Sequence, residues 1–260
     1  MKIGKFEIDK IYCGDCLELM KGLPNNSIDL CYVDPPFFTK KNFKHFSDRW
    51  ENMNEYLKFI ELRMNEIYRV LEDTGSFYLH CDWHANAYLR ILLDKLFGEK
   101  NFKNEIIWHY HTAGVSKRWW GRKSDTIFFY TKSKNWVYNL IKEKRYYRKK
   151  FFKVTEGYQK ETNGRLYSMV YPDNVWEIPA VLNLSKEYQD YSTQKPERLL
   201  VKIIKASSNK DDIILDPFFG SGTTLAVALK LGRHYLGFDI SEKAYEIATA
   251  RLSQVQVSML

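Results

Sequence analysis

Two groups of side chains have the types and spacing for chemistry, and each follows a segment with the pattern of a buried strand. The first is Asp34-Pro35-Pro36-Phe37, which comes directly after the apolar segment 27–33. A carboxylate and a proline-fixed backbone carbonyl are two rigid acceptors that match the two N–H donors of an exocyclic amine. Acceptors on both hydrogens favour a pyramidal nitrogen and free its lone pair, while Phe37 can stack on an extruded base. A proline turn with an incidental acid is the alternative interpretation.

The second group is the loop from Asp216 to Thr224, which contains Gly220 and Gly222, and Asp239 closes the next strand pattern. Glycines let a backbone approach a ligand, and an acid after the second strand accepts hydrogen bonds from ribose. The loop lacks the third glycine of the dinucleotide fingerprint and the Gly-Lys-Ser/Thr of triphosphate sites. Its leading acid would also repel a pyrophosphate. A ligand with a ribose and a cationic or zwitterionic arm, such as S-adenosylmethionine, fits better than a plain strand–turn–helix corner.

Alternating strand and helix patterns must position these two groups. Strands alternating with helices predict a mainly parallel α/β sheet, and such sheets bind ligands at the carboxyl ends of their strands. Gly75 and Gly98 are placed to end the first two helices. The predicted strands are 27–33, 76–80, 106–108, 126–130, 212–216 and 234–239, and the predicted helices are 54–73, 85–97, 196–206, 223–231 and 242–252.

The two motifs together resemble those of the amino-group DNA methyltransferases, which methylate N6 of adenine or N4 of cytosine. Segment 34–37 matches the catalytic motif of that family, and segment 216–224 matches its cofactor loop, with Phe219 where a smaller residue or Cys is more usual. Segment 192–196 is similar to the Pro-Thr-Gln-Lys-Pro element of the family, with Ser192 in place of the first proline. Segment 75–82 is also similar to the family pattern.

The order of the motifs resembles the permuted beta class, because the catalytic motif comes first and the cofactor loop last. The resemblance implies a Rossmann-like, S-adenosylmethionine-dependent methyltransferase sheet, permuted, with an inserted DNA target-recognition region. It divides the chain into a catalytic half (1–131), a target-recognition region (132–191) and a cofactor-binding half (192–260). Permutation changes connectivity and not packing, so the two motifs are expected at neighbouring strand ends.

The resemblance also implies a role for each motif residue. Asp34 and the carbonyl of Pro35 accept hydrogen bonds from the target amine, Pro36 completes the motif, and Phe37 stacks on the base. Asp239 is expected to bind the ribose. Asp15 is expected near the cofactor adenine and Lys195 at the cofactor carboxylate. The other residues expected around the cofactor are Asp216, Phe218, Gly220, Ser221, Gly222 and Thr223.

The predicted activity is site-specific methyl transfer to N6 of adenine in DNA, by base flipping and direct in-line transfer. Asp in the first motif position resembles adenine enzymes more often than cytosine enzymes, and N4-cytosine transfer is the alternative. Motif order and Asp34 disfavour an RNA or protein amide methyltransferase, and the intact motifs disfavour a non-catalytic DNA-binding subunit. Methylation of a ring carbon commonly uses a cysteine after proline, and none of the four cysteines follows proline.

Positive charge is concentrated in one segment. Residues 132–165 hold eleven basic and three acidic residues, a surplus that equals the net charge of +8 of the whole chain. Aromatic residues interleave with these charges, which suits phosphate contacts and base packing. A solvated face is the alternative interpretation. The predicted DNA contacts here are Lys144, Arg145, Arg148, Lys149 and Lys150, and a second basic-aromatic cluster adds Lys117, Arg118 and Arg122.

Composition limits the remaining partners and ligands. The hydrophobic content of 45% excludes a disordered chain. No signal-peptide or membrane-spanning pattern is found, so a cytoplasmic protein is expected. Double-stranded DNA is the expected partner, with a cognate restriction endonuclease and a homodimer as further candidates. Cys13 and Cys16 have metal-like spacing, with His80, Cys81 and His84 as a conceivable complement, but ordinary buried thiols and no metal are expected.

Overall fold

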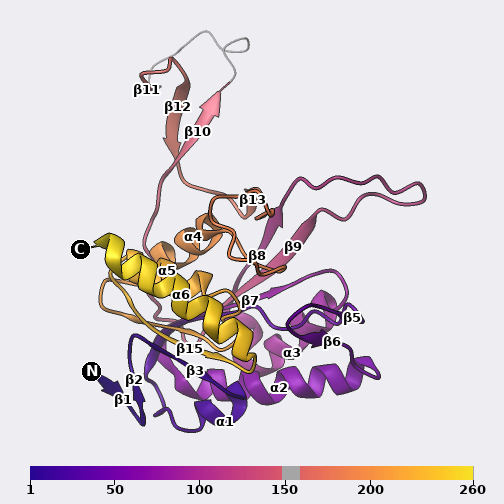
Figure 1. The fold of residues 1–260 in the computed structure, drawn as a ribbon, viewed down its shortest axis with the longest axis vertical. Coiled ribbons are helices and arrows are strands. Elements are labelled where there is room, and N and C mark those ends of the chain that lie inside the picture. Colours follow the sequence, from indigo (N-terminus) through magenta and orange to yellow (C-terminus); the bar gives the residue numbers. More distant parts are fainter. Residues whose placement is uncertain (148–158, 260) are drawn as a thin grey trace.

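The computed structural model describes residues 1–147 and 159–259 and is built around one large sheet (Figure 1). Within those residues the sheet has eight strands, and every neighbouring pair is parallel except the two pairs that include β9. The predicted mainly parallel α/β fold is therefore confirmed. In spatial order the strands are β13 (Val175–Glu177), β8 (Phe102–His109), β9 (Ser124–Thr131), β7 (Leu71–Cys81), β4 (Ile28–Val33), β14 (Ile213–Asp216), β15 (His234–Asp239) and β3 (Lys10–Cys13).

Helices cover both faces of this sheet because the central strands are apolar on both sides. In β4, Cys31 and Val33 face one core and Leu30 and Tyr32 face the other. The first core contains side chains of α1 (Cys16–Met20), α2 (Met53–Val70) and α3 (Asn86–Phe97), and the second contains those of α4 (Glu197–Ser207), α5 (Thr223–Lys230) and α6 (Glu242–Met259).

Among the described residues, no helix is long and apolar enough to cross a bilayer.

The predicted role of Gly75 as the end of a helix is wrong. Helix α2 ends at Val70, and the chain enters β7 at Leu71, which already has an extended backbone. Gly75 lies inside β7, where the pairing register with β4 shifts. A Cβ atom on Gly75 would lie 2.7 Å from Leu71 Cγ and 2.8 Å from the carbonyl oxygen of Glu72. The glycine therefore permits a close backbone approach within a strand instead of ending a helix.

The segment predicted as one target-recognition region, 132–191, contributes to two sheets. β10 (Glu143–Tyr147), β12 (Leu166–Val170) and β11 (Gln159–Lys160) form a small antiparallel sheet that projects from the body (Figure 1). β13 instead extends the main sheet beside β8. The sequence shows no strand pattern for β10–β12 because both faces of this sheet are at least partly exposed, so no period of two in hydrophobicity arises. Arg148, Lys149 and Lys150 lie outside the described residues.

Several short elements were not predicted. A hairpin of β1 (Lys2–Ile3) and β2 (Phe6–Glu7) precedes β3, and a turn of 3-10 helix, η1 (Glu99–Asn101), follows α3. A second hairpin, β5 (Lys41–Asn42) and β6 (Ser47–Asp48), follows the Asp-Pro-Pro-Phe motif. Strands of two residues are too short to produce a periodic pattern.

Candidate active site

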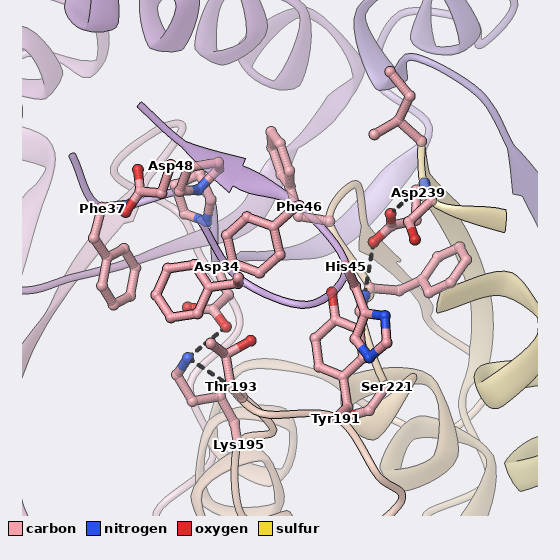
Figure 2. A pocket seen from close by; sticks show the side chains of 18 of the residues that line it. Asp34, Phe37, His45, Phe46, Asp48, Tyr191, Thr193, Lys195, Ser221 and Asp239 are labelled. Carbon is pink, nitrogen blue, oxygen red and sulfur yellow. Dashed lines mark hydrogen bonds and ion pairs between the residues drawn. The ribbon is translucent and has the colours of Figure 1, made fainter. Parts of the chain in front are cut away.

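The two motifs meet at the carboxyl ends of adjacent strands. β4 pairs in parallel with β14 through Leu30 with Ile214 and Cys31 with Leu215. The two motifs follow directly at this edge, and a cavity of about 410 Å³ lies between them. Figure 2 shows Asp34 and Lys195 on one side of this cavity and Asp239 on the other. The predicted residues that line it are Asp34, Pro35, Pro36, Phe37, Lys195, Asp216, Phe218, Gly220, Ser221, Thr223 and Asp239.

Asp34 forms an ion pair with Lys195, and both residues line the cavity. Lys195 Nζ donates to Asp34 Oδ2 at 2.6 Å, and it also lies 5.2 Å from the centre of the Phe37 ring. The other carboxylate oxygen of Asp34, Oδ1, is buried and has no hydrogen-bond partner. Oδ1 lies 3.9 Å from His80 Nδ1, so Oδ2, which Lys195 bonds, is the oxygen left for an incoming N–H group. The expected contact of Lys195 with a cofactor carboxylate stays a prediction.

A buried group behind Asp34 was not recognised as part of the site. His80 Nδ1 lies 2.7 Å from Tyr32 Oη and 3.9 Å from Asp34 Oδ1, and His80 Nε2 lies 3.2 Å from Asp125 Oδ2. Burial acts to raise the pKa of Asp125, but hydrogen bonding and charge from His80 outweigh it, and the pKa lies below its usual value. His80 thus supports Tyr32, which lines the cavity, from the buried side. The sequence signal was its place in segment 75–82, which is similar to the family pattern.

Asp216 and Asp239 are carboxylates at the ends of β14 and β15, the first buried and the second partly buried. Burial raises the pKa of Asp216 to about 7, and the negative charges of Asp34 and Asp239 add to this shift. Burial also raises the pKa of Asp239, although it accepts hydrogen bonds from the backbone N–H groups of Gly220 and Ser241, each at 2.9 Å. Two carboxylates with raised pKa values in one cavity favour a cationic ligand.

Gly222 and Asp15 lie outside the cavity lining. Gly222 precedes α5 with a φ of 72°, and a Cβ atom there would lie 2.8 Å from Ala248 Cβ. Its glycine is therefore required by backbone conformation and by packing on α6. Asp15 caps α1 by accepting from Leu17 N, and Arg63 Nη2 donates to its two carboxylate oxygens at 2.8 and 2.9 Å. The expected contact of Asp15 with the cofactor adenine stays a prediction.

The hairpin β5–β6 covers part of the cavity and was missed by the sequence analysis. Phe43, His45 and Phe46 from the hairpin, together with Trp50, line the cavity. The His45 ring stacks on Tyr191 at 5.2 Å between centroids (Figure 2). Lys44 and Asp190 beside them form an ion pair of 3.0 Å. The density of aromatic residues after the Asp-Pro-Pro-Phe motif was a signal that could have identified this cover.

The described DNA-contact candidates lie on two extensions of the body (Figure 1). Lys117, Arg118 and Arg122 belong to the long β8–β9 connection, which leaves the carboxyl end of β8 and therefore the same sheet edge as the cavity. Arg122 lies over the Trp83 ring at 3.6 Å. On the small sheet, Lys144 pairs with Glu161 at 2.7 Å and Arg145 with Asp173 at 3.3 Å, and both basic side chains remain exposed.

Comparison with known proteins agrees with this geometry. A family model described as DNA methylase matches residues 28–250. The chain is 34% identical over 252 residues to the DNA adenine methyltransferase YhdJ of Escherichia coli (strain K12), covering 95% of this chain and 83% of that protein. It is also 34% identical over 245 residues to the Type II methyltransferase M.HpaI of Haemophilus parainfluenzae, covering 94% and 74%.

Solved structures share the fold at lower sequence identity. The M1.HpyAVI–SAM complex aligns with a TM-score of 0.63 and 21% identity over 94% of this chain and 98% of that chain. The cytosine-N4-specific PvuII DNA methyltransferase aligns with a TM-score of 0.69 and 17% identity over 98% and 94%. The match of the family model over most of the chain and the two relatives at 34% identity lead to one conclusion. This chain belongs to the N6/N4 DNA methylase family.

Proposed function

We propose that this protein transfers a methyl group from S-adenosylmethionine to N6 of adenine in double-stranded DNA. The observation that carries the proposal is the single cavity that joins the Asp34 carboxylate and the Phe37 ring to the Asp216–Asp239 pair. Asp34 and Phe37 supply an acceptor and a stacking surface for an amino base. Asp216 and Asp239 supply acceptors for a ribose and a cation. The name of the Escherichia coli relative, a DNA adenine methyltransferase, supports adenine as the target.

The cavity residues fit S-adenosylmethionine by their chemistry. This cofactor would supply an electrophilic methyl group on a sulfonium. Asp239 at the end of β15 is placed to accept from ribose hydroxyls, as acids after the second strand do in doubly wound folds. Asp216, buried with its pKa raised to about 7, gains a favourable partner when a cation enters. Ser221 and Gly220 line the same wall of the cavity.

The chain itself holds and orients the reacting amine. Asp34 accepts one N–H of the amine and the Pro35 carbonyl accepts the other, while Phe37 stacks on the base. Orientation supplies most of the acceleration in a direct displacement, because the two reacting groups are held in line. The proton released by the amine passes to the Asp34 carboxylate and from there to water.

N4 of cytosine is the second candidate target, because the two amines are chemically similar. The cytosine-N4-specific PvuII enzyme shares the fold, which supports this candidate at the level of architecture alone. Digestion of methylated DNA to nucleosides followed by mass spectrometry distinguishes N6-methyladenine from N4-methylcytosine. Single-molecule sequencing of DNA from expressing cells reports the recognition site.

Two further partners belong to the proposal. The Type II methyltransferase name of the Haemophilus parainfluenzae relative supports a cognate restriction endonuclease. Tyr88 and Ile91 on α3 are more than half exposed, and this apolar surface supports a homodimer. Sedimentation of the purified protein measures directly whether it forms a homodimer.

The variant Asp34→Ala tests the catalytic assignment. We expect it to transfer labelled methyl groups to unmethylated bacterial DNA at least about 1,000-fold more slowly, because it removes the acceptor that orients the amine. Cofactor affinity, measured by calorimetry, should change by less than about threefold. The matched control Asp73→Ala removes a carboxylate that is 74% exposed and should behave as the unchanged protein. Undiminished transfer by Asp34→Ala would contradict the assignment.

A further inference from the structure

We infer that Lys195 occupies the position of the target amine when no DNA is bound and must leave for the base to enter. This inference rests on the proposed function. Its basis is the set of partners of the Lys195 ammonium group. Nζ donates to Asp34 Oδ2 at 2.6 Å and to the Thr193 carbonyl oxygen at 3.3 Å, and it lies over the Phe37 ring (Figure 2).

These contacts are of the same kinds that the proposed mechanism assigns to the target amine. A carboxylate and a backbone carbonyl accept its N–H groups, and an aromatic face lies against it. An ammonium satisfies all three, because it carries several N–H donors and is attracted to the face of an aromatic ring. The base and the Lys195 ammonium cannot both lie against Phe37 and bond Asp34 Oδ2, since they would occupy the same space.

The ion pair is well shielded from water. The Lys195 side chain is 10% exposed and that of Asp34 is 19% exposed. A pair with this little solvent contact is costly to break without replacement partners. Base entry is therefore an exchange of donors at Asp34. A base with N–H groups replaces the hydrogen bond that Lys195 donates to Asp34. DNA with no base at the target position offers no such donor.

The test compares two duplexes that differ only at the target position. One carries the target adenine within the recognition site found by sequencing, and the other has an abasic site there. The ratio of their dissociation constants isolates base entry, because the phosphate contacts are the same in both. We expect Lys195→Met to raise the preference for the adenine duplex at least about fivefold. Lys195→Arg keeps the ion pair and should leave the preference unchanged or lower it.

Lys132→Met is the matched control. The Lys132 side chain is 11% exposed, close to that of Lys195, and its Nζ bonds the Leu71 carbonyl at the opposite edge of the sheet. This variant should lose stability without changing the ratio of the two dissociation constants. A preference that stays constant or falls in Lys195→Met would overturn the inference.

Cofactor titration separates this inference from the proposed function. Calorimetry with S-adenosylmethionine should give Lys195→Met an affinity within about twofold of the unchanged protein. A loss of tenfold or more would place Lys195 on the cofactor and overturn the inference, even in a protein that methylates DNA normally. If the unchanged protein transfers no methyl group to DNA, the proposed function fails by that result alone, and the titration still decides where Lys195 acts.

Discussion

Of the four carboxylates that line the cavity in the described part of the chain, Asp34, Asp216 and Asp239 end strands of the main sheet or follow them directly, and their environments differ. Asp34 has Lys195 as a counter-ion. Asp216 has no cationic partner among the described residues, and it accepts from the Phe218 backbone N–H at 3.0 Å. Burial first, and then the charges of Asp34 and Asp239, raise the pKa of Asp216 to about 7. The residues around Asp216 therefore leave its negative charge unbalanced, and a cationic ligand would balance it.

The raised pKa of Asp216 predicts a pH dependence of cofactor affinity. With a pKa of about 7, Asp216 is mostly protonated at pH 6 and mostly ionised at pH 8, and the ionised form attracts a sulfonium. Affinity for S-adenosylmethionine should therefore rise about tenfold from pH 6 to pH 8. Asp216→Asn should bind more weakly and lose this dependence. Calorimetry across the range measures both proteins, and a flat profile in the unchanged protein would refute the role of Asp216.

At the scale of elements, the hairpin β5–β6 is held against the catalytic motif by one buried carboxylate. Asp48 is 1% exposed and accepts from the backbone N–H groups of Phe37, Phe38 and Thr39 at 3.2, 2.8 and 2.8 Å, and from Thr39 Oγ1 at 2.6 Å. Phe38 and Lys40 have positive φ angles of 65° and 61°. Asp48 offsets this backbone strain and connects the cover of the cavity to the stacking residue.

Loss of that connection should affect stability and activity together. We expect Asp48→Ala to lower the free energy of unfolding by about 2–4 kcal/mol, because several buried N–H donors lose a charged acceptor. Methyl transfer should slow at least about tenfold, because Phe37 loses its support. Urea unfolding and initial rates measure the two effects. Glu51→Ala, an exposed carboxylate three residues later, is the control and should change neither. Normal transfer by a folded Asp48→Ala protein would show that the hairpin has no role in positioning Phe37.

At the scale of the whole molecule, the described candidates for DNA contact, Lys117, Arg118, Arg122, Lys144 and Arg145, lie on extensions of the body. The small sheet of β10–β12 and the β8–β9 connection project from the main sheet in different directions (Figure 1). Trp120, on the β8–β9 connection, is 94% exposed. Basic and aromatic side chains that take little part in the hydrophobic core are suited to contact a polyanion.

Removal of these charges should weaken DNA binding and flatten its salt dependence. The double variants Lys117→Gln/Arg118→Gln and Lys144→Gln/Arg145→Gln should each reduce the slope of log affinity against log salt by about 0.9 for every phosphate that is no longer neutralised. Cofactor affinity should not change. Lys2→Gln/Lys5→Gln removes the same charge from the β1–β2 hairpin and serves as the control. If it weakens binding as strongly, the effect reflects net charge and not the extensions.

The fold class and the two motifs that line the cavity follow from the sequence alone. Segments 27–33 and 212–216 were recognisable as strands because their apolar runs end at residues that cannot continue a ladder. The motifs after them were recognisable because amine and cofactor chemistry restricts residue type at fixed spacing. The exposed strands β10–β12 and the two-residue strands β5 and β6 were not predictable, because they leave no periodic pattern.

Only the tertiary structure decided which side chains are partners. Lys195 and Asp34 are 161 positions apart, and His80 and Asp125 are 45 apart. No local pattern records such pairs, since each joins side chains of elements that only the folded sheet brings together. Gly75 was assigned incorrectly because helical spacing before it does not reveal the close backbone approach to Leu71 and Glu72 within β7. Spacing along the chain selects the residues that can do the chemistry, and the packing of the sheet decides which of them act on each other.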